Sequence, residues 1–160
     1  MLSDERLVDK NDDRSNEKLL RKYLIEKISL NNNPPMLLDI KEISNNENHI
    51  SDFALLGLGV DGHTASLFPN KPEIFSLSGS LLKVKKSNED FERFSLTFEF
   101  LLKSKYLAFL VLGKEKNEVL NEVINGNYNP VKYPTQYIFN NYSRDIEIFC
   151  DKEAFGDMKT

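Results

Sequence analysis

Residues 53–59 read FALLGLG, and residues 60–69 continue as VDGHTASLFP. The first part is an uncharged, mostly apolar run that stops at two glycines. Such a run predicts a strand that is covered on both faces, as in a parallel sheet. Because ligands of such sheets bind beyond the carboxyl ends of the strands, we expect residues 57–69 to border a ligand site.

A second unit of the same kind lies further along the chain. Residues 106–112 form another apolar run, which ends at Gly113, and residues 114–124 carry apolar residues at helical spacing. The order strand, glycine, helix predicts an α/β fold with a Rossmann-like layered parallel sheet and helices on both faces. We expect the whole chain, residues 1–160, to form a single domain.

The remaining segments predict shorter elements around this sheet. We expect a helix over residues 15–28, with Ser15 or Asn16 as its N-cap, and a short helix over residues 98–104. Short strands are expected at residues 81–84, 94–97, 137–139 and 146–150, and an extended piece at residues 36–40. No internal repeat is evident, which agrees with one domain.

The composition limits the partners and the compartment. The 160 residues are 40% hydrophobic and 29% charged, with a formal net charge of −4, which argues against a broad nucleic-acid surface but allows a local anion pocket. No apolar stretch approaches the roughly 20 residues that cross a bilayer, and the N-terminus lacks a signal-peptide pattern. Cys150 is a single cysteine and has no partner for an internal disulfide. We therefore expect a cytoplasmic protein that binds neither nucleic acid nor membrane.

The loop after the first strand carries the residues best suited to chemistry. Gly59 and Gly62 permit tight turns and the close approach of a substrate. His63 can take a proton from water and return it, and the carboxylate of Asp61 can orient the imidazole. The alternative is that His63 only caps a turn. Ser66 adds the third residue type of a nucleophilic triad, but the Gly-x-Ser-x-Gly turn is missing, so we expect it to bond backbone or substrate.

This loop, Gly59-x-Asp61-Gly62-His63-x-Ala65-Ser66-Leu67-Phe68-Pro69, closely resembles the signature of the 6-phosphogluconolactonase family. Three further blocks resemble those of the family and occur in its order: residues 4–8 (DERLV) followed by Ser15-Asn16, residues 93–97 (RFSLT), and residues 113–116 (GKEK). Together the blocks cover most of the chain. The resemblance therefore identifies the sequence as a member of this family.

The resemblance implies the activity and the roles of several residues. It implies hydrolysis of 6-phospho-D-glucono-1,5-lactone to 6-phosphogluconate in the oxidative pentose phosphate pathway, with no metal and no organic cofactor. His63 would be the base and Asp61 its partner, while Arg6 and Lys116 would bind the phosphate. Further candidates for substrate contacts are Gly59, Gly62, Ser66 and Arg93.

Each proposed cation has a simpler interpretation that stays open at this point. Arg6 could form a salt bridge with Asp4 or Glu5, and Lys116 could be a solvated residue of a first helical turn. Arg93, at the start of a strand, could equally be a surface ion pair. For the oxyanion that forms during hydrolysis, amides around Gly62 or Thr64 are the expected donors.

The sequence also departs from the family pattern. Members usually place a strand, a glycine-rich phosphate loop and a helix before the DERLV block, which here begins at Asp4. We expect a sheet that lacks the first strands and the phosphate loop, with apolar faces left uncovered. A catalytically weak or silent sugar-phosphate-binding remnant, or a half that is completed by a second chain or by self-association, is therefore the alternative. A glucosamine-6-phosphate deaminase or isomerase is less favoured, because residues 66–69 (SLFP) do not match the deaminase pattern.

Overall fold

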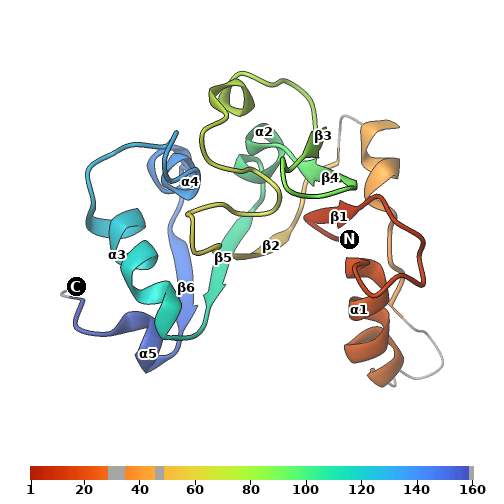
Figure 1. The fold of residues 1–160 in the computed structure, drawn as a ribbon, viewed down its shortest axis with the longest axis horizontal. Helices are drawn as coiled ribbons and strands as arrows, with labels where there is room; N and C mark the ends of the chain where they lie inside the picture. The colour runs from red at the N-terminus through yellow and green to blue at the C-terminus, as the bar shows by residue number, and fades with distance from the viewer. Residues whose placement is uncertain (29–34, 46–48, 159–160) are drawn as a thin grey trace.

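The computed structural model describes residues 1–28, 35–45 and 49–158, which form two three-stranded sheets with helices around them (Figure 1). One sheet is antiparallel, with the strand order β1-β4-β3: β1 (Asp4–Arg6), β3 (Leu81–Lys85) and β4 (Glu92–Leu96). The other is parallel, with the order β2-β5-β6: β2 (Phe53–Gly57), β5 (Tyr106–Val111) and β6 (Ile146–Cys150). The expected parallel α/β architecture is thus present, together with a second sheet of antiparallel strands.

The helices are short, and most begin at a side chain that caps them. The α-helices are α1 (Asn16–Tyr23), α2 (Phe98–Leu102), α3 (Asn117–Asn125), α4 (Thr135–Asn141) and α5 (Lys152–Phe155). The short 3-10 helices are η1 (Ile25–Lys27), η2 (Ile40–Asn45), η3 (Pro72–Phe75) and η4 (Lys114–Lys116). Ser15 caps α1 by accepting a hydrogen bond from the Lys18 amide, as expected.

Two of the short elements expected from the sequence differ in the structure. Residues 137–139 lie inside α4 rather than in a strand. Pro134, whose fixed φ suits a helix start, stands directly before the first residue of α4, and the helix buries Ile138. Residues 36–40 form no strand, and a 3-10 helix begins at Ile40 instead. The expected helix over residues 15–28 ends at Tyr23 and continues as the separate turn η1.

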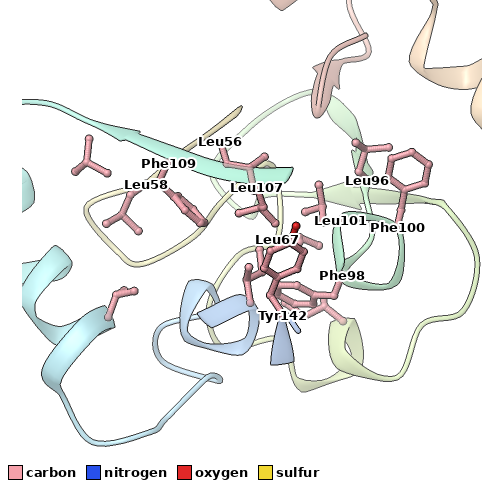
Figure 2. Close-up of a cluster of buried hydrophobic side chains, with 14 of the residues drawn as sticks. Leu56, Leu58, Leu67, Leu96, Phe98, Phe100, Leu101, Leu107, Phe109 and Tyr142 are labelled. Atoms are coloured by element: carbon pink, nitrogen blue, oxygen red, sulfur yellow. The ribbon is translucent and has the colours of Figure 1, made fainter. Parts of the chain in front are cut away.

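One face of the parallel sheet builds the hydrophobic core. Alternate residues of its strands, Leu56 of β2 and Leu107 and Phe109 of β5, are at most 2% exposed. Figure 2 shows these side chains gathered with those of α2, where Leu101 is 1% exposed, and with Tyr142 at the end of α4. The core therefore holds the carboxyl ends of β2 and β5 in place.

The opposite face of the same sheet is open. The strand register aligns Phe53 with Tyr106 and Leu110 with Phe149, and these side chains are 55%, 69%, 44% and 50% exposed. Leu55, on the same face, is 50% exposed. The expectation that β2 is covered on both faces is wrong for the described residues, whereas the expectation of an uncovered apolar face is confirmed.

In the described ranges, no helix combines the length and the apolar character that a membrane-spanning segment would need.

Candidate active site

The loop that follows β2 is folded tightly on itself by two glycines. The Gly59 amide donates a hydrogen bond to the His63 carbonyl at 2.8 Å, and the Gly62 amide donates to the Gly59 carbonyl at 2.9 Å. Gly62 has a φ of 82°, a region that favours glycine. A Cβ on Gly59 would collide with the side chains of His63 and Asp61. The absence of a Cβ at Gly59 therefore leaves the space in which the side chains of Asp61 and His63 contact each other.

Neighbouring elements clamp this loop from both sides. Thr135, the first residue of α4, donates to the Gly62 carbonyl through its amide at 3.0 Å and through its hydroxyl at 2.8 Å. The Thr64 hydroxyl donates to the Gly57 carbonyl at 2.8 Å. Because both threonines are 1% exposed or less, the loop conformation is anchored in the core.

Asp61 and His63 form a pair at the surface of this loop. Asp61 Oδ1 contacts His63 Nδ1 and also accepts the His63 amide at 3.3 Å. The side chains of His63 and Asp61 are 27% and 39% exposed, so that both remain open to solvent. Partial burial by itself raises the pKa of the Asp61 carboxyl, but the hydrogen bond and the charge of His63 outweigh it, so the pKa lies below its usual 3.8. Asp61 is therefore an anion near neutral pH, and it holds the Nδ1 side of the ring.

An aromatic ring links this pair to two cations. The ring of Phe68 lies 4.9 Å from that of His63, centroid to centroid. Arg93 Cζ lies 5.6 Å and Lys86 Nζ 5.2 Å from the centroid of the same Phe68 ring. Sequence reasoning missed Lys86, because only the β3–β4 hairpin carries it to this place and no local motif marks it.

Arg6 ends β1 in the same neighbourhood. Its Nη1 donates to the Arg14 carbonyl at 2.6 Å, and its Nε is buried without a hydrogen-bond partner in the described part of the chain. The pKa of Glu89 is lowered chiefly by the hydrogen bond from Arg93, and the charge of Arg6 adds to the effect. Within the described ranges Arg6 forms no ion pair with Asp4 or Glu5, so the salt-bridge interpretation of this residue is not supported.

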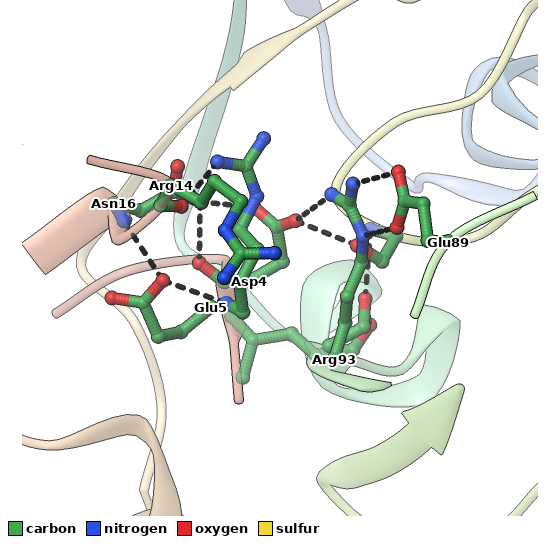
Figure 3. Close-up of polar contacts among 10 residues, drawn as sticks. Asp4, Glu5, Arg14, Asn16, Glu89 and Arg93 are labelled. Carbon is green, nitrogen blue, oxygen red and sulfur yellow. Dashed lines mark hydrogen bonds and ion pairs between the residues drawn. The ribbon is translucent and has the colours of Figure 1, made fainter. Parts of the chain in front are cut away.

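Arg93 forms a largely buried ion pair with Glu89 (Figure 3). Its Nε and Nη2 donate to the two carboxylate oxygens of Glu89 at 2.9 and 2.5 Å. Its Nη1 lies 3.7 Å from Asp4 Oδ2, and the residue is 8% exposed. Arg93 therefore forms an ion pair, as the alternative interpretation expected, but the pair is largely buried rather than at the surface.

Ser66 is likewise turned inward. The residue is fully buried, its hydroxyl donates to Asp4 Oδ2 at 2.6 Å, and its amide donates to Ser95 Oγ at 3.0 Å. It thus bonds other protein groups and presents no surface to a ligand.

Lys116 lies at the edge of the sheet from which the His63 loop also departs. The parallel register pairs Gly57, the last residue of β2, with Leu110, one residue before the end of β5. Lys116 closes the turn η4 that follows β5, and it is half-buried. A separate groove of about 720 Å³ between α3 and α5 is lined by Lys114 but by neither Lys116 nor His63, so it is distinct from the His63 loop.

Among the described residues, no group of three or more His, Cys, Asp or Glu side chains is arranged to hold a metal ion.

Comparisons with known proteins relate the chain to one family and one fold. Residues 1–146 match the family model described as glucosamine-6-phosphate isomerases/6-phosphogluconolactonase. A 6-phosphogluconolactonase of Helicobacter pylori strain J99 is 32% identical over 162 residues, which cover 94% of this chain and 70% of that protein. 6-Phosphogluconolactonase 3 of Saccharomyces cerevisiae is 27% identical, with 99% of this chain and 70% of that protein covered. The chain thus spans about 70% of the length of these relatives.

Solved structures show the same fold. The 6-phosphogluconolactonase of Leishmania guyanensis superposes with a TM-score of 0.75 at 21% identity, covering 99% of this chain and 74% of that one. A structure titled devB protein gives a TM-score of 0.80 at 24% identity, covering 98% and 72%. A monomeric glucosamine-6-phosphate deaminase gives 0.71 at 17% identity, covering 94% and 71%. The fold is therefore shared by proteins with two different activities.

Proposed function

Because this chain belongs to the 6-phosphogluconolactonase family, we propose that it hydrolyses 6-phospho-D-glucono-1,5-lactone to 6-phosphogluconate, with water activated by His63. The observation that supports this most is the Asp61–His63 pair, which stands partly exposed on a glycine-built loop at the carboxyl end of β2. A phosphorylated lactone needs a base, an acid and a cationic phosphate site, and the described residues can supply all three.

The pair suits both proton transfers of the reaction. When His63 Nδ1–H donates a hydrogen bond to the Asp61 carboxylate, the free electron pair lies on Nε2, which can take a proton from water. The resulting hydroxide adds to the lactone carbonyl carbon. Collapse of the tetrahedral intermediate then breaks the bond to the ring oxygen, and the imidazolium returns its proton to that oxygen as the hydroxyl group forms. Asp61 stabilises the imidazolium between the two transfers.

The oxyanion of the intermediate needs a hydrogen-bond donor beside the loop. The Gly62 amide already donates to the Gly59 carbonyl at 2.9 Å. Amides around Gly62 or Thr64 are proposed for that role, since a donor aimed at the developing charge stabilises the transition state by a few kcal/mol.

The phosphate is proposed to bind Arg6 and Lys116. The guanidinium of Arg6 can offer two parallel donors to phosphate oxygens, whereas Lys116 adds a mobile point charge. Lys86 and Arg93, which flank Phe68, add positive potential close to His63. These cations would draw the dianionic substrate toward the base although the chain as a whole has a net charge of −4.

The test compares lactone hydrolysis with the spontaneous rate. The wild-type chain should accelerate hydrolysis of the phosphorylated lactone, and His63→Ala should lower kcat by about 100-fold or more. His49→Ala is the matched control, because His49 is the one other histidine and is exposed. Equal rates with and without protein would contradict the proposal, as would full activity of His63→Ala. Ammonia release from glucosamine 6-phosphate would instead indicate a deaminase.

The uncovered face of the parallel sheet favours a second candidate. Five large apolar side chains are exposed on this face. Such a chain could bind a sugar phosphate without hydrolysing any lactone, or it could become active only when a second chain covers the face. Calorimetric binding of 6-phosphogluconate without lactone hydrolysis would support this alternative over the first.

A further inference from the structure

The two halves of the proposed site come from different sheets. His63 stands on the loop that leaves β2 of the parallel sheet, whereas Arg6 ends β1 of the antiparallel sheet. A substrate that is held by its phosphate at one place and attacked at its carbonyl at the other requires a fixed separation between the two. The contacts that join the two sheets therefore matter for catalysis as well as for stability.

Asp4 makes such a contact. Its Oδ2 accepts the Ser66 hydroxyl at 2.6 Å, which ties β1 directly to the loop that carries His63. Its carbonyl and Oδ1 accept the Asn16 side-chain amide at 3.0 and 3.3 Å, and Arg93 Nη1 lies 3.7 Å from Oδ2. Figure 3 shows Asp4 between Arg93 and the start of α1, where Asn16 lies. One carboxylate thus contacts α1, β4 and the catalytic loop.

Ser66 connects Asp4 to the residues around His63. It lies three residues after His63 and two residues before Phe68, the ring that packs on the imidazole at 4.9 Å. Its amide is fixed as well, because it donates to Ser95 Oγ of β4 at 3.0 Å. Ser66 is fully buried and surrounded by packed protein atoms. If its hydroxyl moves, the neighbouring residues of the loop must therefore move with it.

We propose that Asp4 is a positioning residue that sets the distance between the phosphate site at Arg6 and the base at His63, acting through Ser66. This inference rests on the proposed function, because it assigns Arg6 to the phosphate and His63 to the water. Asp4 lies two residues before Arg6 on the same short strand, so its bond to Ser66 fixes the strand and the loop relative to each other.

The first test separates positioning from general stability by changing the substrate. With the phosphorylated lactone, Asp4→Ala should lower kcat by about 10- to 100-fold, because the carbonyl is held away from the base. With glucono-1,5-lactone, which has no phosphate for Arg6 to hold, the loosened His63 loop should lower kcat/KM by only about two- to fivefold. An equal loss on both substrates, or no loss on either, would overturn the proposal.

Partner and conservative variants sharpen this test. Ser66→Ala should show the same dependence on substrate, and the double variant should be no worse than either single one, because both changes break the same contact. Asp4→Asn keeps an oxygen that can accept the Ser66 hydroxyl and should recover most of the activity. The matched control is Asp145→Ala, an exposed aspartate in the turn before β6. Additive losses in the double variant would count against a shared mechanism.

A readout that needs no activity distinguishes this inference from the proposed function. In Asp4→Ala, the amides of residues 62–68 should exchange with deuterium about tenfold faster or more, while those of β5 stay protected. Unchanged exchange in the loop would overturn the positioning role even in an active protein. If the wild type hydrolyses no lactone but Asp4→Ala still releases the loop, the proposed function fails while the link between the sheets stands.

Discussion

Two glycines decide whether Asp61 and His63 can form their pair. A side chain on Gly59 would occupy the space of the imidazole, and Gly62 adopts a φ of 82° while its carbonyl accepts both donors of Thr135. A Cβ placed on Gly62 would meet the ring and the backbone of Tyr133. The loop therefore has room for no Cβ at either position.

Gly62→Ala should destabilise the protein by about 1–3 kcal/mol through the strain of a positive φ. The added Cβ would also lie 2.8 Å from Tyr133 Cδ1 and 2.9 Å from its Cα. Urea unfolding measures the loss. Gly57→Ala is the matched control, because nothing lies within 4 Å of a Cβ placed there. If both variants unfold at the same urea concentration, the strain at Gly62 is not what shapes the loop.

At the scale of elements, the β3–β4 hairpin brings charge to the site. It carries Lys86, Glu89 and Arg93, and the bidentate Arg93–Glu89 pair fixes the end of the hairpin beside Phe68. The side chains of Arg93 and Glu89 are 10% and 18% exposed, so their interaction is only partly screened by water. The ion pair therefore holds the end of the hairpin, with Arg93, beside Phe68 and the site.

The ion pair predicts a pH dependence of stability. The hydrogen bond from Arg93 holds the pKa of Glu89 below its usual 4.5, so its contribution is complete above pH 4.5 and is lost as the pH falls through the lowered pKa. Glu89→Gln should destabilise the protein by about 1–3 kcal/mol at pH 7, and the difference from wild type should shrink below pH 4.5.

Chemical denaturation at a series of pH values from neutral to acidic measures this difference. The matched control is Glu73→Gln, because Glu73 is exposed on η3. A difference between wild type and Glu89→Gln that stays constant with pH would show that the charge of Glu89 is not its source.

At the scale of the whole molecule, the parallel sheet has one buried face and one solvent-exposed face. The large side chains on the solvent-exposed face are Phe53, Leu55, Tyr106, Leu110 and Phe149. Together they form an apolar patch on one sheet face, and soluble monomers rarely expose contiguous apolar patches larger than a few hundred Å². Such a patch favours association through the sheet face.

We therefore expect the chain to associate as its concentration rises. Leu110→Lys, which places a charge in the middle strand of the open face, should reduce this association, and it should cost little stability because Leu110 is 44% exposed. Sedimentation velocity at several concentrations measures the effect. Leu19→Lys on α1, where the side chain is 42% exposed, is the matched control. Equal association of the wild type and Leu110→Lys would locate the contact elsewhere.

The sequence predicted the elements that are marked by a continuous pattern of several neighbouring residues. The strands expected from the apolar runs of β2 and β5, the strand β6 and the Ser15 cap of α1 were all confirmed. Residues 137–139 were mistaken for a strand, because three consecutive large side chains satisfy helical and extended periodicity equally well. Only the burial of Ile138 under the sheet and the turn at Pro134 decide for α4.

By itself the sequence determined the parallel strands, the glycine turn and the meeting of Asp61 with His63, because two residues on one tight loop are bound to be neighbours. Tertiary structure alone decided which charges surround that pair. Arg6, Lys86 and Arg93 are far from His63 along the chain, and the pairing of β1 and β3 with β4 is what collects them. The same pairing turned Ser66 inward onto Asp4. Burial and partner choice depend on contacts between distant segments, which no local pattern encodes.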